Sequence, residues 1–165
     1  MSDFIFNKEN GDIKFVGDFE SLYANEKDPW LQSSEEPSEM RKYYEFSRQN
    51  LMNVIHSKKL NQILEVGCGL GKTTNLIKEE TNTDIDGLDI SQVAVEKASN
   101  KYRHIKFYQG DILDFQFRNR YKTVIISQCL WYILHNFDSV ISNITSQLNQ
   151  FGHILFTQAF LKEQK

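Results

Sequence analysis

The chain has 165 residues, 40% of them hydrophobic and 13% aromatic, and a formal net charge of −3 at pH 7. This length suits one domain with a buried core, and the charge lacks the basic excess of most proteins that bind nucleic acid. No apolar run approaches the ~20 residues that span a bilayer, and the N-terminus does not resemble a signal peptide.

The expected partner is therefore a small molecule rather than nucleic acid or a membrane. The two cysteines, Cys68 and Cys129, do not form a close pair in the sequence and suit a reducing compartment. We expect a cytoplasmic protein, whose oligomeric state the sequence leaves open.

Residues 1–36 are expected to form an N-terminal arm or lid ahead of a main domain at 37–165. Apolar stretches on both sides of Asn10-Gly11 predict a small hairpin or an arm that orders on docking, and a short helix follows at 18–23. Pro37 predicts the start of a longer helix that ends near His56. Its apolar side runs through Met40, Tyr44, Leu51, Val54 and Ile55.

A glycine-rich turn after an apolar run is the most informative stretch. Residues 63–66 read as a strand, and Gly67, Gly69 and Gly71 follow at alternate positions before a helix at 72–80. Such a turn lets a ligand approach the backbone closely, and the helix that follows offers its unpaired N–H groups to that ligand. A dinucleotide fingerprint would need glycine where Lys72 stands, and a P-loop would need it where Val66 stands.

Two more acids follow at the ends of predicted strands. Residues 85–91 read as a short strand that ends in the carboxylate of Asp89, which lies 22 residues after Gly67, close to the ~20-residue offset of a ribose-binding acid. Asp111 follows the strand at 105–110, where it could accept a hydrogen bond from an amine such as that of adenine. Each acid also has a structural alternative as a helix cap, Asp89 with Ser91 and Asp111 with Asp114.

The pattern from Glu65 to Gly71, with these acids, resembles class I S-adenosylmethionine (SAM)-dependent methyltransferases. The region from Tyr23 to Tyr44 is similar to the lid of their nodulation N-methyltransferase type. The resemblance implies a Rossmann-like α/β fold with a mostly parallel sheet and SAM as the cofactor. It assigns Glu65 to the methionine moiety, Asp89 to the ribose and Asp111 to the adenine. The full set of cofactor contacts it implies is Trp30, Arg41, Glu65, Gly67, Cys68, Gly69, Gly71, Asp89, Ile90, Asp111, Ile112 and Ser127.

Substrate chemistry is expected after the β-branched strand at 123–127, because open α/β sheets bind ligands at the carboxyl ends of their strands. In the resembled enzymes an acid stands where this chain has Gln128, which weakens the case for a carboxylate base. Tyr132 and His135 remain as candidate catalytic residues that could bind or deprotonate a nucleophile. Packing for Tyr132 and helix capping for His135 stay open as alternatives. The other histidines are dispersed, so no metal site is expected.

A helix at 137–148 and a strand at 153–157 complete the predicted elements. The resembled fold has seven strands in its sheet and this sequence supplies five, so we expect a sheet truncated after its fifth strand. The function this suggests is methyl transfer to nitrogen or oxygen of a small polar acceptor, such as a sugar or amine. A SAM-binding non-catalytic or regulatory subunit and an NAD-dependent oxidoreductase are the alternatives.

Overall fold

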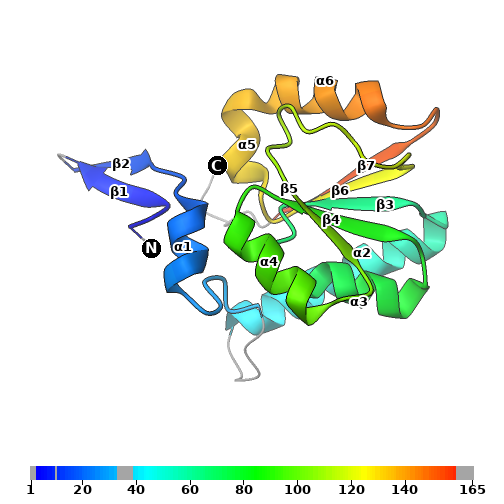
Figure 1. The fold of residues 1–165 in the computed structure, drawn as a ribbon, viewed down its shortest axis with the longest axis horizontal. Coiled ribbons are helices and arrows are strands. Elements are labelled where there is room, and N and C mark those ends of the chain that lie inside the picture. The colour runs from blue at the N-terminus through cyan, green and yellow to red at the C-terminus, as the bar shows by residue number, and fades with distance from the viewer. Residues whose placement is uncertain (1–2, 10, 33–38, 159–165) are drawn as a thin grey trace.

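A sheet of five parallel strands forms the centre of the molecule. The computed structural model describes residues 3–9, 11–32 and 39–158. The strand order is β5-β4-β3-β6-β7, formed by Lys106–Gln109, Ile85–Asp89, Ile63–Val66, Thr123–Ser127 and His153–Thr157 (Figure 1). All four neighbouring pairs are parallel. The predicted Rossmann-like α/β fold is confirmed.

Helices cover both faces of this sheet. The helices are α2 (Glu39–Lys58), α3 (Lys72–Thr81), α4 (Gln92–Lys101), the short α5 (Leu130–Ile133) and α6 (Phe137–Gln147), and a 3₁₀ turn, η1 (Leu134–Asn136), joins the last two. β3 sends Ile63 toward α2 and α3, and its neighbour Leu64 toward α6. A strand buried on both faces favours a continuous apolar run, which is present at 124–126 of β6, while β3 follows the same pattern except at the buried Glu65.

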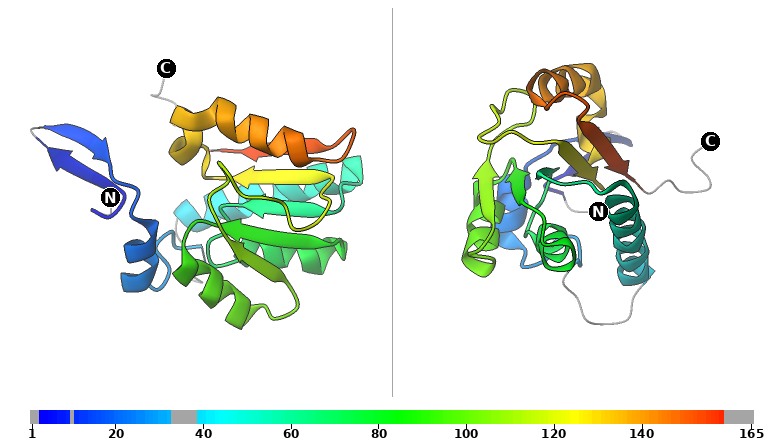
Figure 2. Two further views of the ribbon diagram at one scale, coloured as in Figure 1. Left: turned by 45° about the horizontal axis from the view of Figure 1, so that its top comes forward. Right: turned by 90° about the vertical axis from the view of Figure 1, so that its right-hand side faces the viewer.

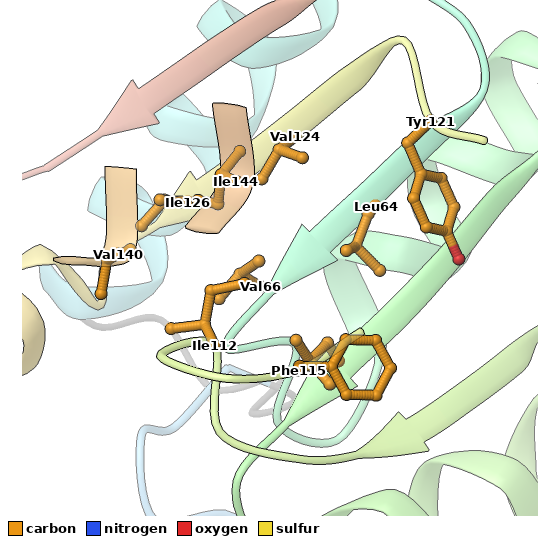
Figure 3. Packing of buried hydrophobic residues seen from close by; sticks show 10 residues of the cluster. Leu64, Val66, Ile112, Phe115, Tyr121, Val124, Ile126, Val140 and Ile144 are labelled. Carbon is orange, nitrogen blue, oxygen red and sulfur yellow. The ribbon is translucent and has the colours of Figure 1, made fainter. Parts of the chain in front are cut away.

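The larger core cluster lies between the sheet and α6. Figure 3 shows Val140 and Ile144 of α6 beside Val124 and Ile126 of β6. The connection after β5 contributes Ile112, Phe115 and Tyr121 to the same cluster. The packing of this connection beside β4 keeps the loop that carries Asp111 close to the strand ends.

The N-terminal segment extends beyond the sheet and its helices (Figures 1 and 2). The predicted hairpin is present as antiparallel strands β1 (Phe6–Glu9) and β2 (Asp12–Phe15). Helix α1 (Phe19–Asn25) follows, with Asp18 as its N-cap. Glu20 of α1 accepts hydrogen bonds from the Ser91 hydroxyl at 2.6 Å and the Val93 amide at 3.3 Å. These bonds fix α1 to the N-terminus of α4.

Helix α2 agrees with the sequence analysis in part. Its predicted start at Pro37 lies outside the described residues. Tyr44, Leu51 and Ile55 are buried as expected, but Met40 is 45% exposed. The prediction for Met40 was wrong because the buried side of the helix begins a turn later, at Tyr44. None of the helices in the described ranges is both long and apolar enough to cross a membrane.

Candidate functional site

The turn between β3 and α3 is built on backbone that needs glycine. Gly67, Gly69 and Gly71 have φ values of 72°, 52° and 74°, in the left-handed region. A Cβ atom on Gly69 would lie 2.6 Å from the Tyr23 hydroxyl, and one on Gly67 would lie 2.8 Å from Cys129 Sγ. Gly71 precedes α3 without any side-chain cap, so amides of the first turn lack a side-chain partner there.

A cleft of about 300 Å³ lies beside this turn, at the carboxyl ends of the strands. Its walls come from the glycine turn, the segments after β4, β5 and β6, and the N-terminal segment. The structure brings ten of the predicted site residues to this single cleft: Trp30, Gly67, Gly69, Asp89, Ile90, Asp111, Ile112, Ser127, Tyr132 and His135. Residues far apart in the sequence therefore share one site.

Asp89 links the glycine turn to the next helix. Its Oδ2 accepts from the Gly69 amide at 2.7 Å, and its Oδ1 accepts from the Ser91 amide at 3.0 Å. Burial raises the pKa of Asp89, and these hydrogen bonds partly offset that shift. Ser91, rather than Asp89, is the N-cap of α4. The carboxylate thus holds the turn in shape and also faces the cleft.

Asp111 lies on the loop after β5 and is partly exposed. Its Oδ1 accepts from the Leu113 amide at 2.9 Å, which fixes the start of the turn over residues 112–114. The neighbouring Ile112 is buried, whereas Ile90 across the cleft is 47% exposed. These two side chains give the cleft an apolar end next to a carboxylate.

A second, smaller cavity adjoins the cleft and contains Glu65, Cys68, Arg48 and Gln128. The Thr74 hydroxyl donates to Glu65 at 2.5 Å. Burial raises the pKa of Glu65 to about 7, against the opposing effects of Thr74 and the positive charge of Arg48. Arg48 donates to the Thr73 hydroxyl at 3.3 Å and lies over the Tyr44 ring. A guanidinium beside a carboxyl group can bind both ends of an amino acid.

Arg48 was not among the predicted site residues, whereas Arg41 was. Arg41 pairs with Glu45 at 2.7 Å and lines neither of these two cavities. The two arginines lie seven residues apart, so they share one side of α2. That spacing is the signal that could have indicated Arg48. Gly71 also lies outside both cavities and packs closely against Phe107, where a Cβ would come within 2.7 Å of the ring.

Tyr23 is a second residue that the sequence analysis did not assign to the site. It is buried against the glycine turn and accepts a hydrogen bond from Trp30 Nε1 at 3.0 Å. Burial, with the nearby charge of Asp89, raises the pKa of Tyr23 well above its usual value. The hydroxyl stays protonated, and Tyr23 and Trp30 together cover the turn.

Tyr132 projects from α5 into a group of aromatic rings. Burial raises the pKa of Tyr132 to about 12, so its phenol is protonated at neutral pH and can donate a hydrogen bond but is a poor base. His135 lies on η1 and is exposed. Asn136, not His135, occupies the N-cap position of α6.

Gln128 joins the end of β6 to helix α2. Its φ of 60° is unusual for a residue other than glycine. Tyr43 donates to its side-chain oxygen, and its amide nitrogen donates to the Ser47 hydroxyl at 3.0 Å. No group of three or more His, Cys, Asp or Glu side chains within the described part of the chain could hold a metal ion.

Comparisons with known proteins agree with this geometry. A family model described as a methyltransferase domain matches residues 57–164. An uncharacterized methyltransferase of Alkaliphilus oremlandii (strain OhILAs) is 24% identical over 155 residues, covering 91% of this chain and 71% of the relative. The malonyl-[acyl-carrier protein] O-methyltransferase of Bacillus anthracis is 35% identical over 100 residues, 58% of this chain and 36% of the relative.

The solved structures include the N-methyltransferase NodS from Bradyrhizobium japonicum WM9 in complex with S-adenosyl-L-homocysteine (SAH). It has a TM-score of 0.67 and 22% identity, over 83% of this chain and 69% of NodS. The chain therefore spans between about a third and about 70% of the lengths of these three proteins.

Proposed function

The chain belongs to the methyltransferase domain family, and from that premise we propose that it transfers the methyl group of SAM to a nitrogen or oxygen atom of a small molecule. The observation that supports this most is the cleft in which Gly67, Gly69, Asp89 and Asp111 meet. An acid that accepts from the glycine turn, and a second acid on the loop after β5, suit a ligand with a ribose and a purine.

The residues of the two cavities fit SAM in each of its parts. Asp89 would bind the ribose hydroxyls, while Asp111, Ile90 and Ile112 would hold the adenine. Glu65 and Arg48 in the smaller cavity would bind the amino and carboxylate groups of the methionine portion. We assign Arg48 to this role in place of Arg41 because Arg48 lies beside Glu65 and Arg41 lines neither cavity.

SAM supplies an electrophilic methyl group when it is bound, so the chain needs to orient the acceptor and exclude water. Tyr23 and Trp30 cover the glycine turn and would shield the reacting atoms. Tyr132 would donate a hydrogen bond to the acceptor through its protonated phenol. His135, at the end of the cleft near α5, would take the proton that the acceptor loses.

Titration of the purified protein with SAH tests the proposal. We expect saturable binding at micromolar SAH, and at least ~10-fold weaker binding for Asp89→Ala, because a charge-assisted contact to the ribose is lost. Phe151→Ala is the control, since that side chain is 87% exposed and does not line the cleft. Circular dichroism checks that each variant is folded. No saturable binding to the wild-type chain would reject the cofactor and with it the activity.

The acceptor class is part of the proposal. Resemblance at the sequence level suggests a sugar or amine, while the relatives include both an N-methyltransferase and an O-methyltransferase. Radiolabelled SAM with a panel of amines, alcohols and carboxylates would identify the class.

A SAM-binding subunit without activity is the second candidate. It is favoured by Gln128, which stands where the resembled enzymes carry an acid and is bonded to Ser47 and Tyr43. Cofactor binding without turnover of any acceptor would support it. Membership of the methyltransferase family argues against the NAD-dependent alternative.

We also propose that the segment up to residue 36 acts as the lid of a domain that begins at 37. That boundary lies in 33–38, outside the described residues. The contribution of Phe15, Val16, Phe19, Tyr23 and Trp30 to the cleft supports a covering role.

A further inference from the structure

One wall of the cleft consists of aromatic rings and is not used by any of the proposed cofactor contacts except Trp30. We call this set the aromatic wall: Phe15 of β2, Phe19 of α1, Trp30 of the loop after α1, and Tyr132 of α5. Three separate parts of the N-terminal segment thus meet one helix that follows β6. Because reaction partners bind at the carboxyl ends of strands, this wall faces the space left for the acceptor.

The rings hold one another in fixed positions. Tyr132 lies at the centre, stacked with Phe15 at 5.9 Å between centroids and 20° between planes. Phe19 meets Tyr132 edge-on at 5.1 Å and 77°, and Trp30 lies 6.1 Å away. Aromatic pairs at such distances contribute about 0.5–1.5 kcal/mol each beyond burial. The wall is therefore a preformed apolar surface rather than a set of separate side chains.

The carboxylates of the cleft accept hydrogen bonds from backbone amides rather than from the rings of this wall. Asp89 and Asp111 are bonded to backbone amides beside the strand ends. Asp28 accepts from the Gln32 amide at 3.1 Å, in the loop that also contacts Arg48. Besides Tyr132 itself, the titratable side chains of the cleft that contact the wall include Tyr23, whose hydroxyl accepts from Trp30 Nε1 at 3.0 Å, and His135, whose ring lies 6.2 Å from Phe15.

This arrangement discriminates between acceptor classes. At the wall, the hydroxyls of a sugar would lose water without gaining enough hydrogen-bond partners. A flat apolar ring would instead stack on the fixed rings at no such penalty. The phenol of Tyr132 then offers one hydrogen bond to orient a single polar group.

Building on the proposed methyl transfer, we propose that the acceptor is a neutral planar ring compound that carries its nucleophilic hydroxyl or amine directly on the ring. During transfer to a ring hydroxyl, a bond forms between the acceptor oxygen and the methyl carbon while the carbon–sulfur bond breaks. The electron pair of that bond stays on sulfur, and the hydroxyl proton passes to His135 or to water. The charge of the sulfonium is thereby neutralised and one proton is released.

Calorimetric titration with 2-naphthol, in the presence of saturating SAH, tests this acceptor class. Decahydro-2-naphthol is the matched probe, since it keeps the size and the hydroxyl but loses the flat ring, and glucosamine represents the amino sugars. We expect 2-naphthol to bind about 10-fold more tightly than its saturated counterpart, the effect of one or two ring contacts. We expect no saturable binding of glucosamine in the same concentration range.

Variants of residues in the aromatic wall test whether the tighter binding of 2-naphthol arises from these rings. Tyr132→Leu and Phe19→Leu each keep apolar bulk but remove a ring, and should weaken 2-naphthol binding about 5-fold. Tyr132→Phe keeps the ring but loses the hydrogen bond of the phenol, so it should weaken 2-naphthol binding less than Tyr132→Leu does, whereas Phe151→Leu on the surface should stay within about 2-fold of the wild type. SAH affinity should be unchanged in all four, which shows that the cleft is intact.

Equal binding of 2-naphthol and decahydro-2-naphthol, tighter binding of glucosamine, or indifference to both leucine variants would overturn the acceptor class. SAH binding in the same protein would then leave the proposed methyl transfer standing. The 2-naphthol titrations are repeated without SAH. If SAH fails to bind, the titrations without SAH still measure the preference for a flat ring, and only the proposed methyl transfer is rejected.

Discussion

Glu65 carries a carboxyl group into the interior at the end of β3, where only Thr74 and Arg48 offset its burial. With its pKa raised from 4.5 to about 7, the folded chain holds this proton more tightly than the unfolded chain does. Stability from this group is therefore fully present below about pH 4.5 and is lost as the pH rises through about 7. The loss amounts to at most ~3 kcal/mol, since each pKa unit corresponds to about 1.4 kcal/mol.

Glu65→Gln should remove this pH dependence because glutamine accepts from Thr74 without titrating. We expect the variant to be more stable than the wild type by about 1–3 kcal/mol at pH 8, with a difference that shrinks toward pH 5. Urea denaturation at pH 5, 6, 7 and 8 measures it. The control is Glu79→Gln, an exposed glutamate on α3. Parallel pH curves for wild type and Glu65→Gln would contradict the assignment.

The same carboxylate should have the opposite effect on cofactor binding. SAH carries an ammonium group that would pair with ionised Glu65 in the proposed site, so wild-type SAH affinity should rise several-fold between pH 6 and pH 8. Glu65→Gln should bind more weakly and without this slope. Calorimetry at the two pH values compares them, and a slope retained by the glutamine variant would assign the titration to another group.

Single residues also show what sequence could and could not reveal about the site. The spacing of Gly67, Gly69, Asp89 and Asp111 brings all four to the cleft because the strand ends of a parallel sheet lie at one edge, whereas Gly71 lies outside it. Arg48 could not be separated from Arg41, since only the packing of α2 against the glycine turn decides which arginine meets Glu65. The stacking around Tyr132 depends on the hairpin, which contacts it from more than 100 residues away in the sequence.

Among the elements, α4 has the clearest dependence on one side chain. The Ser91 hydroxyl accepts from the Ala94 amide at 3.2 Å and donates to Glu20 of α1 at 2.6 Å. Ser91→Ala removes both bonds, so we expect a loss of about 1–2 kcal/mol in the free energy of unfolding. Chemical denaturation measures it. Ser99→Ala is the control, a serine of the same helix away from its N-terminus. Losses of equal size in both variants would show that Ser91 has no special role.

Most strands and helices after residue 39 follow from the pattern of the sequence, because the central strands β3 and β6 are buried on both faces and the longer helices bury one side. The helix at 137–148 and the strand at 153–157 were predicted to within one residue. Met40 was misassigned because periodicity alone does not show where a helix leaves the core. The course of the N-terminal segment across the cleft had no local signal beyond the Asn10-Gly11 turn.

At the scale of the whole molecule, the cleft joins the sheet, the connection after β5 and the N-terminal segment. A ligand that binds only the folded state at 100 times its dissociation constant adds about 2.7 kcal/mol to stability. For a chain of this size SAH should therefore raise the melting temperature by about 5–10 °C. Differential scanning fluorimetry measures the shift. Asp89→Ala should show a much smaller shift at the same SAH concentration, and an equal shift would contradict the role of Asp89.

Asp89, Ser91 and Glu20 form a continuous chain of hydrogen bonds from the proposed ribose acid to helix α1. The acid that would receive the nucleoside is thereby tied to the segment that bears Phe19 and Tyr23. From this linkage we predict an order of events in turnover: the nucleoside binds first, the acceptor follows, and SAH is the last to depart. Steady-state kinetics should then show SAH as a competitive inhibitor toward SAM and a noncompetitive one toward the acceptor.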